Sequence, residues 1–169
     1  MLNTRSWRPG LCLAALSCLL AVPAWAAQQV FEGRVVSVHD GDSLQVRDTH
    51  GRRHRIRLAF IDAPELQQAY GQASRNALRA RLLDQEVQVT VLEQDRYRRS
   101  VAQIHLQGED MGLWQLQQGA AWHYRSLARS RQSRSEYAHY DAAEVSARHF
   151  NRGLWRGADP MPPWRFRRQ

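Results

Sequence analysis

The sequence predicts an α+β fold, mainly β, built as a five-stranded barrel of the OB type with about three helices. Three alternating polar and apolar runs come first, a helical pattern follows, and two more alternating runs precede the remaining helices. Three strands, a helix and two strands in this order are typical of a partly open OB barrel. An unrelated α+β sandwich has the same periodicity, so the pattern alone leaves both open.

The first three predicted strands form a meander. They cover residues 30–38, 44–46 and 53–61. Asp40-Gly41 is a strong hairpin-turn signal between the first two strands. Pro64 ends the third strand, because proline has no N–H to donate to a sheet.

The period of the apolar residues becomes helical from Leu66, and Asp84 lies where this helix is expected to end. The later elements are expected as strands over 87–91 and 100–106, a short helix between Asp110 and Gly119, and a helix over 133–150. Asp110 is a suitable N-cap and Gly119 a suitable stop. Residues 27–157 are therefore expected to form one domain, followed by a Pro/Arg-rich C-terminal tail, 158–169, whose basic end, 165–168, is expected to be frayed.

Residues 1–26 read as a secretory signal peptide. Arg5 and Arg8 precede an apolar run over 11–22, and small residues end at Ala26. The run is shorter than the ~20 residues of a membrane-spanning helix, although an uncleaved anchor or a lipid-modified Cys18 are alternatives. The sequence thus predicts export to the periplasm or the medium, and a mature chain without cysteine.

The chain is strongly basic. It carries 24 Lys+Arg against 16 Asp+Glu, a net charge of +8, and every one of these cations is arginine. Guanidinium groups bind phosphate oxygens two at a time, so a polyanionic partner is expected. A GC-rich genome also favours arginine codons, so composition alone does not establish a polyanionic partner.

Acidic residues gather at two points of the predicted meander. Asp40 and Asp42 flank Gly41, and Asp62 and Glu65 lie at the end of the third strand. Two carboxylates about 4 Å apart repel by ~4 kcal/mol at an effective dielectric constant near 20. A cation would offset this repulsion, and oxygen ligands favour a hard metal ion such as calcium or magnesium.

Arginines accompany these acids. Arg57 precedes Asp62 on the third strand, and the run 95–99 (Asp-Arg-Tyr-Arg-Arg) joins the fourth and fifth strands. Asp-Gly and Asp-x-Pro are each more often a turn or a strand end than a site, and surface arginines often only face solvent. Together they indicate a phosphate site beside a metal site.

Three motifs, residues 38–43, 57–65 and 95–99, resemble successive motifs of the staphylococcal nuclease (thermonuclease) family. The resemblance runs from about Val30 to Trp155. It implies a calcium-dependent secreted nuclease that hydrolyses DNA and RNA to 3′-phosphate products. It also implies calcium binding by the carboxylates of Asp42 and Asp62 and by the backbone carbonyl of Ala63.

The same resemblance implies the catalytic roles. Glu65 would be the general base that activates water, and Arg57 and Arg99 would bind the phosphate and neutralise its developing charge. Asp40 would support the turn or the ligands beside it. Tyr97 and Tyr124 are candidate substrate-binding residues.

Two departures from the family pattern concern the turns. Ser43 replaces the usual threonine but keeps the hydroxyl group. Arg98 stands where glycine is common, so it would be strained if that position needs a positive φ. Arg98 could be mistaken for the catalytic arginine, and spacing favours Arg99.

Two other classes of function fit part of the sequence. A nucleic-acid-binding OB module that has lost catalysis would be expected to lack Glu65, the aspartates or the arginines, and all are present. A basic cell-envelope protein that holds polyanions would explain the charge and the signal, but not the acidic cluster. The expected enzyme acts as a monomer on nucleic acids, with no stable protein partner and no membrane contact after signal removal.

Overall fold

The computed structural model describes residues 29–169, so the predicted signal peptide lies outside the described residues. The strands are β1 (Val30–Val38), β2 (Ser43–Asp48), β3 (Arg53–Leu58), β4 (Ile61–Asp62), β5 (Glu86–Gln94), β6 (Ser100–Leu106), β7 (Glu109–Asp110) and β8 (Trp122–His123). The helices are α1 (Gly71–Leu82), α2 (Met111–Gln117), α3 (Arg125–Arg131), α4 (Arg134–His149), the 3-10 turn η1 (Gly153–Arg156) and α5 (Pro163–Phe166). None of these helices has the length and apolarity needed to cross a membrane.

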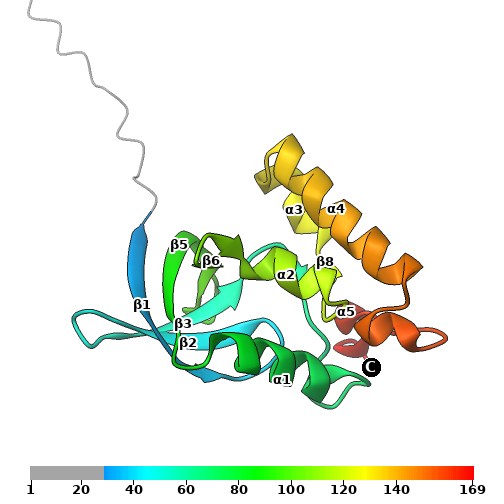
Figure 1. Ribbon diagram of the computed structural model, residues 1–169, viewed down its shortest axis with the longest axis horizontal. Helices are drawn as coiled ribbons and strands as arrows, with labels where there is room; N and C mark the ends of the chain where they lie inside the picture. Colours follow the sequence, from blue (N-terminus) through cyan, green and yellow to red (C-terminus); the bar gives the residue numbers. More distant parts are fainter. Residues whose placement is uncertain (1–28) are drawn as a thin grey trace, which may run out of the picture.

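Five strands close into a barrel in the order β3-β2-β1-β5-β6 (Figure 1). The first three strands form the expected antiparallel meander, and β1 also pairs with β5. A parallel pairing of β3 with β6, which aligns Ile56 with Ser100 and Leu58 with Ala102, closes the ring. This closure confirms the OB-type barrel and excludes the sandwich, in which the sheet would not return to its third strand.

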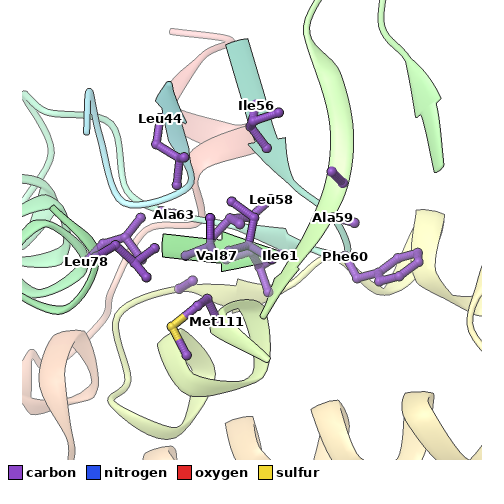
Figure 2. Packing of buried hydrophobic residues seen from close by; sticks show 14 of the residues in the cluster. Leu44, Ile56, Leu58, Ala59, Phe60, Ile61, Ala63, Leu78, Val87 and Met111 are labelled. Atoms are coloured by element: carbon purple, nitrogen blue, oxygen red, sulfur yellow. The ribbon is translucent and has the colours of Figure 1, made fainter. Parts of the chain in front are cut away.

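The barrel interior shares one apolar core with helices α1 to α4 (Figure 2). Leu44, Ile56 and Leu58 point inward from the barrel strands, and Leu78 of α1 and Met111 of α2 pack against them, all at most 1% exposed. Complete burial of one such side chain contributes about 1.5–3 kcal/mol. The strands that carry the candidate site are thereby held rigidly against α1 and α2.

Helix α1 begins later than the apolar period predicts. Tyr70 has a φ of 69°, in the left-handed region, which ends any helix that runs into it. A Cβ at Gly71 would lie 1.9 Å from the carbonyl oxygen of Glu65, so only glycine fits there. The expected helical start at Leu66 is therefore wrong, and residues 63–70 form a loop that carries Glu65.

Helices α2 and α4 begin at side-chain caps. The Asp110 side chain accepts hydrogen bonds from the backbone N–H groups of Gly112 and Leu113 at the start of α2. Ser133 and Glu136 form a capping box at the start of α4, as the predicted helix over 133–150 requires. Helix α2 lies between the barrel and α4.

The C-terminal segment, residues 158–169, differs from the expected frayed tail. It contains α5 and packs on the domain, with the Trp164 ring 6.4 Å from the Trp122 ring. Gln68 donates a hydrogen bond to the backbone carbonyl of Met161 at 3.0 Å. The segment is ordered because its aromatic residues find an apolar surface at β8, a contact that its basic composition does not reveal.

Candidate active site

The turn between β1 and β2 is pressed against α1. A Cβ at Gly41 would lie 1.9 Å from the Ser74 hydroxyl oxygen and 2.7 Å from the Ala63 Cβ, so glycine is required by space. The buried amide of Gln115 donates a hydrogen bond to the Gly41 carbonyl at 2.6 Å. Ser74 in turn donates to the Ala120 carbonyl at 2.7 Å. These contacts fix the turn against the helices.

Asp40 holds the turn from within. Its carboxylate accepts hydrogen bonds from the backbone N–H groups of Asp42 and Ser43, at 2.9 and 2.6 Å, and from the Ser43 hydroxyl at 2.7 Å. Ser43 makes the last of these contacts with its hydroxyl group, which a threonine side chain also carries. The side chain of Asp42 is left free to point away from its own turn.

Asp42 and Asp62 meet through Arg57. The register of β2 and β3 sets Ser43 opposite Arg57, and Asp62 lies on β4 just beyond β3. The Arg57 guanidinium lies 2.9 Å from Asp62 Oδ1 and 3.5 Å from Asp42 Oδ2. It also donates to the carbonyls of Leu58 and Ile61, both at 3.0 Å. The structure therefore joins three of the predicted site residues.

Burial changes the proton affinity of Asp42. Its side chain is 9% exposed, and burial raises its pKa to about 7. Arg57 lowers the pKa, while the negative charges of Asp40 and Asp62 raise it further. Burial also acts to lower the pKa of Arg57, but Asp42 and Asp62 outweigh this and raise it. The pocket thus favours an additional positive charge beside Asp42.

Ala63 and Glu65 lie on the loop after β4. The backbone N–H of Ala63 donates to Asp42 Oδ2 at 2.8 Å, which ties the loop to the β1–β2 turn. Glu65 is held by its backbone N–H, which donates to the Gln68 side chain at 2.8 Å. Its carboxylate is one-third exposed and accepts a hydrogen bond from Arg167 at 2.8 Å. Among Asp42, Asp62 and Glu65, the carboxylate of Glu65 is therefore the most accessible to solvent.

The predicted arginine motif forms the turn between β5 and β6. Arg98 has a φ of 60°, the left-handed conformation that its replacement of glycine anticipates. The side chain of Arg99 pairs with Asp95 at 2.8 Å. Burial would raise the pKa of Asp95, but hydrogen bonds from the Arg99 backbone and side chain outweigh it and lower the pKa. Arg98 is exposed, whereas Arg99 lines the cleft.

One cleft of about 540 Å³ brings these residues together. Its walls include all the predicted site residues: Asp40, Asp42, Arg57, Asp62, Ala63, Glu65, Tyr97, Arg99 and Tyr124. Tyr124 follows β8, and its backbone N–H donates to the Phe60 carbonyl at 2.8 Å. Tyr97, on the turn between β5 and β6, is 55% exposed, with Arg96 over its ring.

The donors that meet in the cleft suit a hard cation. Asp42 and Asp62 contribute only oxygen, and Ala63 adds a backbone carbonyl. Within residues 29–169, no three carboxylate, imidazole or thiol side chains converge closely enough to form a metal site on their own. A cation would therefore complete its shell with the carbonyl, water or phosphate, which calcium and magnesium accept.

Sequence reasoning missed three kinds of residue in or behind the site. Gln115 and Ser74 support the β1–β2 turn from α2 and α1, and nothing in their local sequence marks this role. Arg55 lines the cleft two residues before Arg57, and the alternation of β3 could have identified it. Arg167 reaches the cleft from the C-terminal segment, and the run of arginines there was the one available signal.

The sequence is similar to those of proteins named as nucleases. Residues 55–157 match the model of the family described as Staphylococcal nuclease homologue; this range includes Arg57, Asp62, Glu65 and Arg99 and begins after Asp42. An "Uncharacterized endonuclease" of Escherichia coli O157:H7 is 37% identical over 136 residues, covering 80% of this chain and 84% of that protein. A "Micrococcal nuclease" of Shigella flexneri is 36% identical over 165 residues, covering 92% and 89%. A "Probable staphylococcal-like nuclease CAN3" of Oryza sativa subsp. japonica is 34% identical over 135 residues, covering 80% of this chain and 32% of that protein.

Proposed function

The chain belongs to the staphylococcal nuclease family, and we propose that it is a calcium-dependent nuclease that hydrolyses DNA and RNA to 3′-phosphate products. The observation that carries this proposal is the meeting of Asp42 and Asp62 at the Arg57 guanidinium, with Glu65 beside them in the same cleft. The two buried carboxylates attract a cation, and the guanidinium beside them attracts a phosphate. Because the cleft is open to solvent, it favours a phosphate that is bound to a cation.

Asp42, Asp62 and the Ala63 carbonyl would hold the calcium ion. Bound there, the ion supplies Lewis-acid polarisation of a phosphate oxygen and offsets the charges of the two carboxylates. Arg57 holds Asp62 in place and presents its guanidinium to the cleft. Arg99 lines the same cleft from the β5–β6 turn, next to the paired strand β3, so a phosphate in the cleft would meet both arginines.

Glu65 is the general base of the proposed mechanism. Its carboxylate is exposed enough to reach water and lies in the cleft with the two arginines. It would take a proton from the water that attacks phosphorus, while Arg57 and Arg99 neutralise the charge that develops on the phosphate oxygens. General-base catalysis of this kind contributes about 10²–10⁴-fold.

A row of arginines supports a polymeric substrate. Arg53, Arg55 and Arg57 alternate along β3 and therefore face the same side, with Arg47 of β2 paired opposite Arg53. Arg47, Arg53 and Arg55 are exposed. Like charges opposite each other are destabilising, so phosphates that continue beyond the cleft would relieve this repulsion. Such contacts carry no base specificity, in keeping with action on both DNA and RNA.

We place the enzyme outside the cytoplasm, because the first residues have the order of charged, apolar and small residues that a signal peptide requires. It would act as a monomer. Detection of the purified protein's N-terminus after export would test removal after Ala26.

The Glu65→Gln variant tests the mechanism. It keeps the shape of the side chain and removes the base, so turnover should fall by about 10²–10⁴-fold with an unchanged unfolding transition. Gln67→Glu, a charge change in the same loop, is the control that should leave turnover within about threefold. Near-native turnover of Glu65→Gln would remove Glu65 from the mechanism.

A second experiment tests cation, substrate and product together. Single- and double-stranded DNA and RNA are incubated with the protein in calcium, in magnesium and in chelator, and the ends of the fragments are identified. Cleavage in calcium to 3′-phosphate ends is expected. Undiminished cleavage in chelator would contradict the calcium dependence, and tight binding without cleavage in any cation would favour a noncatalytic OB module.

A further inference from the structure

The C-terminal segment, residues 158–169, places a guanidinium on the carboxylates of the cleft. Arg167 donates to both oxygens of Asp62, at 3.1 Å to Oδ1 and 2.7 Å to Oδ2, and to Glu65 at 2.8 Å. Its hydrogen bond with Asp62 is the largest reason that its pKa is raised. One arginine from the end of the chain thus engages a proposed calcium ligand and the proposed general base together.

These contacts use the oxygen positions that a cation would need. Asp62 is 1% exposed, and its Oδ1 already accepts a hydrogen bond from Arg57 at 2.9 Å. With Arg167 added, three of the roughly four acceptor positions of this carboxylate are occupied. The remaining acceptor position is on Oδ2, beside the Arg167 guanidinium, so a calcium ion bound there would be repelled by the positive charge of Arg167.

A second contact of the segment covers the aromatic wall of the cleft. The Trp164 ring stacks on Tyr124, with ring centroids 5.9 Å apart and an angle of 28° between the planes. Tyr124 is the candidate for stacking on a nucleobase, and bases stack on aromatic faces of this kind. The covered face of Tyr124 is therefore closed to a base while Trp164 remains in place.

Gln68 connects the segment to the loop of the general base. Its amide oxygen accepts a hydrogen bond from the Glu65 backbone N–H, and its NH₂ group donates to the Met161 carbonyl. Trp164 anchors the segment on the apolar cluster around Trp122, whereas the Arg167 side chain is 44% exposed. Because Arg167 is partly solvated, a divalent cation that binds the same carboxylates can displace it.

We propose that the C-terminal segment is an internal occupant of the active cleft, competing with calcium through Arg167 and with a nucleobase through Trp164. Binding of calcium releases Arg167 from Asp62 and Glu65, which frees the general base and loosens α5. The inference rests on the proposed function, because it takes the calcium position from there. It makes the metal-free enzyme a closed form and the calcium-loaded enzyme an open one.

Calcium titration of the purified protein by calorimetry tests the competition. The Arg167→Gln variant should bind calcium about 5–10-fold more tightly than the unmodified protein, because the competing guanidinium is absent. Arg168→Gln is the matched control. It removes the same charge one residue away, and the Arg168 side chain makes no hydrogen bond or ion pair within residues 29–169. It should change the affinity by less than about twofold.

Amide hydrogen exchange provides the second measurement. Saturating calcium should speed exchange in residues 163–169 of the unmodified protein, because α5 loosens when Arg167 leaves. Equal calcium affinity of the unmodified protein and Arg167→Gln, or exchange unaffected by calcium, would overturn the competition and leave the proposed nuclease standing. Absence of calcium binding in all three proteins would overturn the calcium part of the proposed function and the competition with it.

Discussion

The end of β3 and the β5–β6 turn, which both line the cleft, hold their arginines in different ways. Arg57 is 15% exposed and is bound by Asp62 and by two backbone carbonyls around the end of β3. Arg99 is 24% exposed, and its ion pair is with Asp95 of its own turn, four residues away. The wall of β2, β3 and β4 is thus built by tertiary contacts, whereas the β5–β6 turn is held by local ones.

This difference separates stability from catalysis. Removal of Arg57 leaves buried carboxylates without their main cation, so the fold and the chemistry are expected to fail together. Removal of Arg99 leaves a partly exposed acid that water can solvate, so the chemistry alone is expected to suffer. Substitutions of Arg57 and of Arg99 can therefore test whether the first supports both stability and catalysis and the second catalysis alone.

The largest effect is expected for Arg57→Gln. It should lower the free energy of unfolding by about 3 kcal/mol, the lower end for a broken buried ion pair, because Arg167 still neutralises Asp62. Turnover should fall by about 10²–10³-fold or more. Denaturant unfolding in chelator measures the first quantity, with the exposed Arg55→Gln as a control expected within about 0.5 kcal/mol. A loss below about 1 kcal/mol would contradict the tertiary role of Arg57.

Arg99→Gln should reduce turnover by about 10²–10³-fold and stability by no more than about 1 kcal/mol. Arg98→Gln is its control, since Arg98 is exposed and lies outside the cleft lining. It should keep turnover within about threefold of the original. If instead Arg98→Gln removed activity and Arg99→Gln did not, the assignment of the phosphate-binding arginine would have to be exchanged.

The raised pKa of Asp42, about 7, predicts a pH dependence. Below pH 7 the metal-free protein carries a proton on Asp42 that calcium must expel, so affinity should weaken by about tenfold per pH unit, and level off above 7. Since the folded pKa exceeds the ordinary 3.8, stability of the metal-free protein should fall as pH rises from about 4 to about 7. Calorimetric titrations on both sides of pH 7 check this; a flat affinity below 7 would contradict it.

The smallest effect is expected for Arg98→Gly. Glycine removes the strain of a positive φ, worth about 1–2 kcal/mol, but raises the entropy of the unfolded chain by about 0.4–1 kcal/mol. The net gain should be about 0.5–1 kcal/mol, seen as a small rise in Tm with turnover retained. Arg96→Gly, at a position without positive φ, is the matched control and should lower Tm. A lower Tm for Arg98→Gly would show that its side chain stabilises the turn.

The barrel and most of the site were readable from the sequence because their signals are local. Alternation marked the strands, Asp110 and Gly119 marked the two ends of α2, and a helical period marked α4. The short elements β4, β8 and α3 gave no such signal. Strands of two residues have no period, and β4 and β8 depend on the pairing of Asp62 with Trp122. The sequence did not reveal the late start of α1, because the apolar period begins at Leu66, before the helix. The close approach of Gly71 to the Glu65 backbone keeps the preceding residues out of the helix.

Two features of the cleft show where local reading ends. The glycine-like position of Arg98 could be inferred from its motif, and its φ of 60° agrees. The position of Arg167 could not, because its partners lie 105 and 102 residues earlier in the chain. The sequence by itself determined the barrel, the family and the cleft residues Asp40, Asp42, Asp62, Glu65, Arg57 and Arg99, since turns, periods and motifs are encoded in neighbouring residues. Only the tertiary structure decided the burial that raises the pKa of Asp42 and the docking of the C-terminal segment on Asp62, because both arise where distant segments exclude water together.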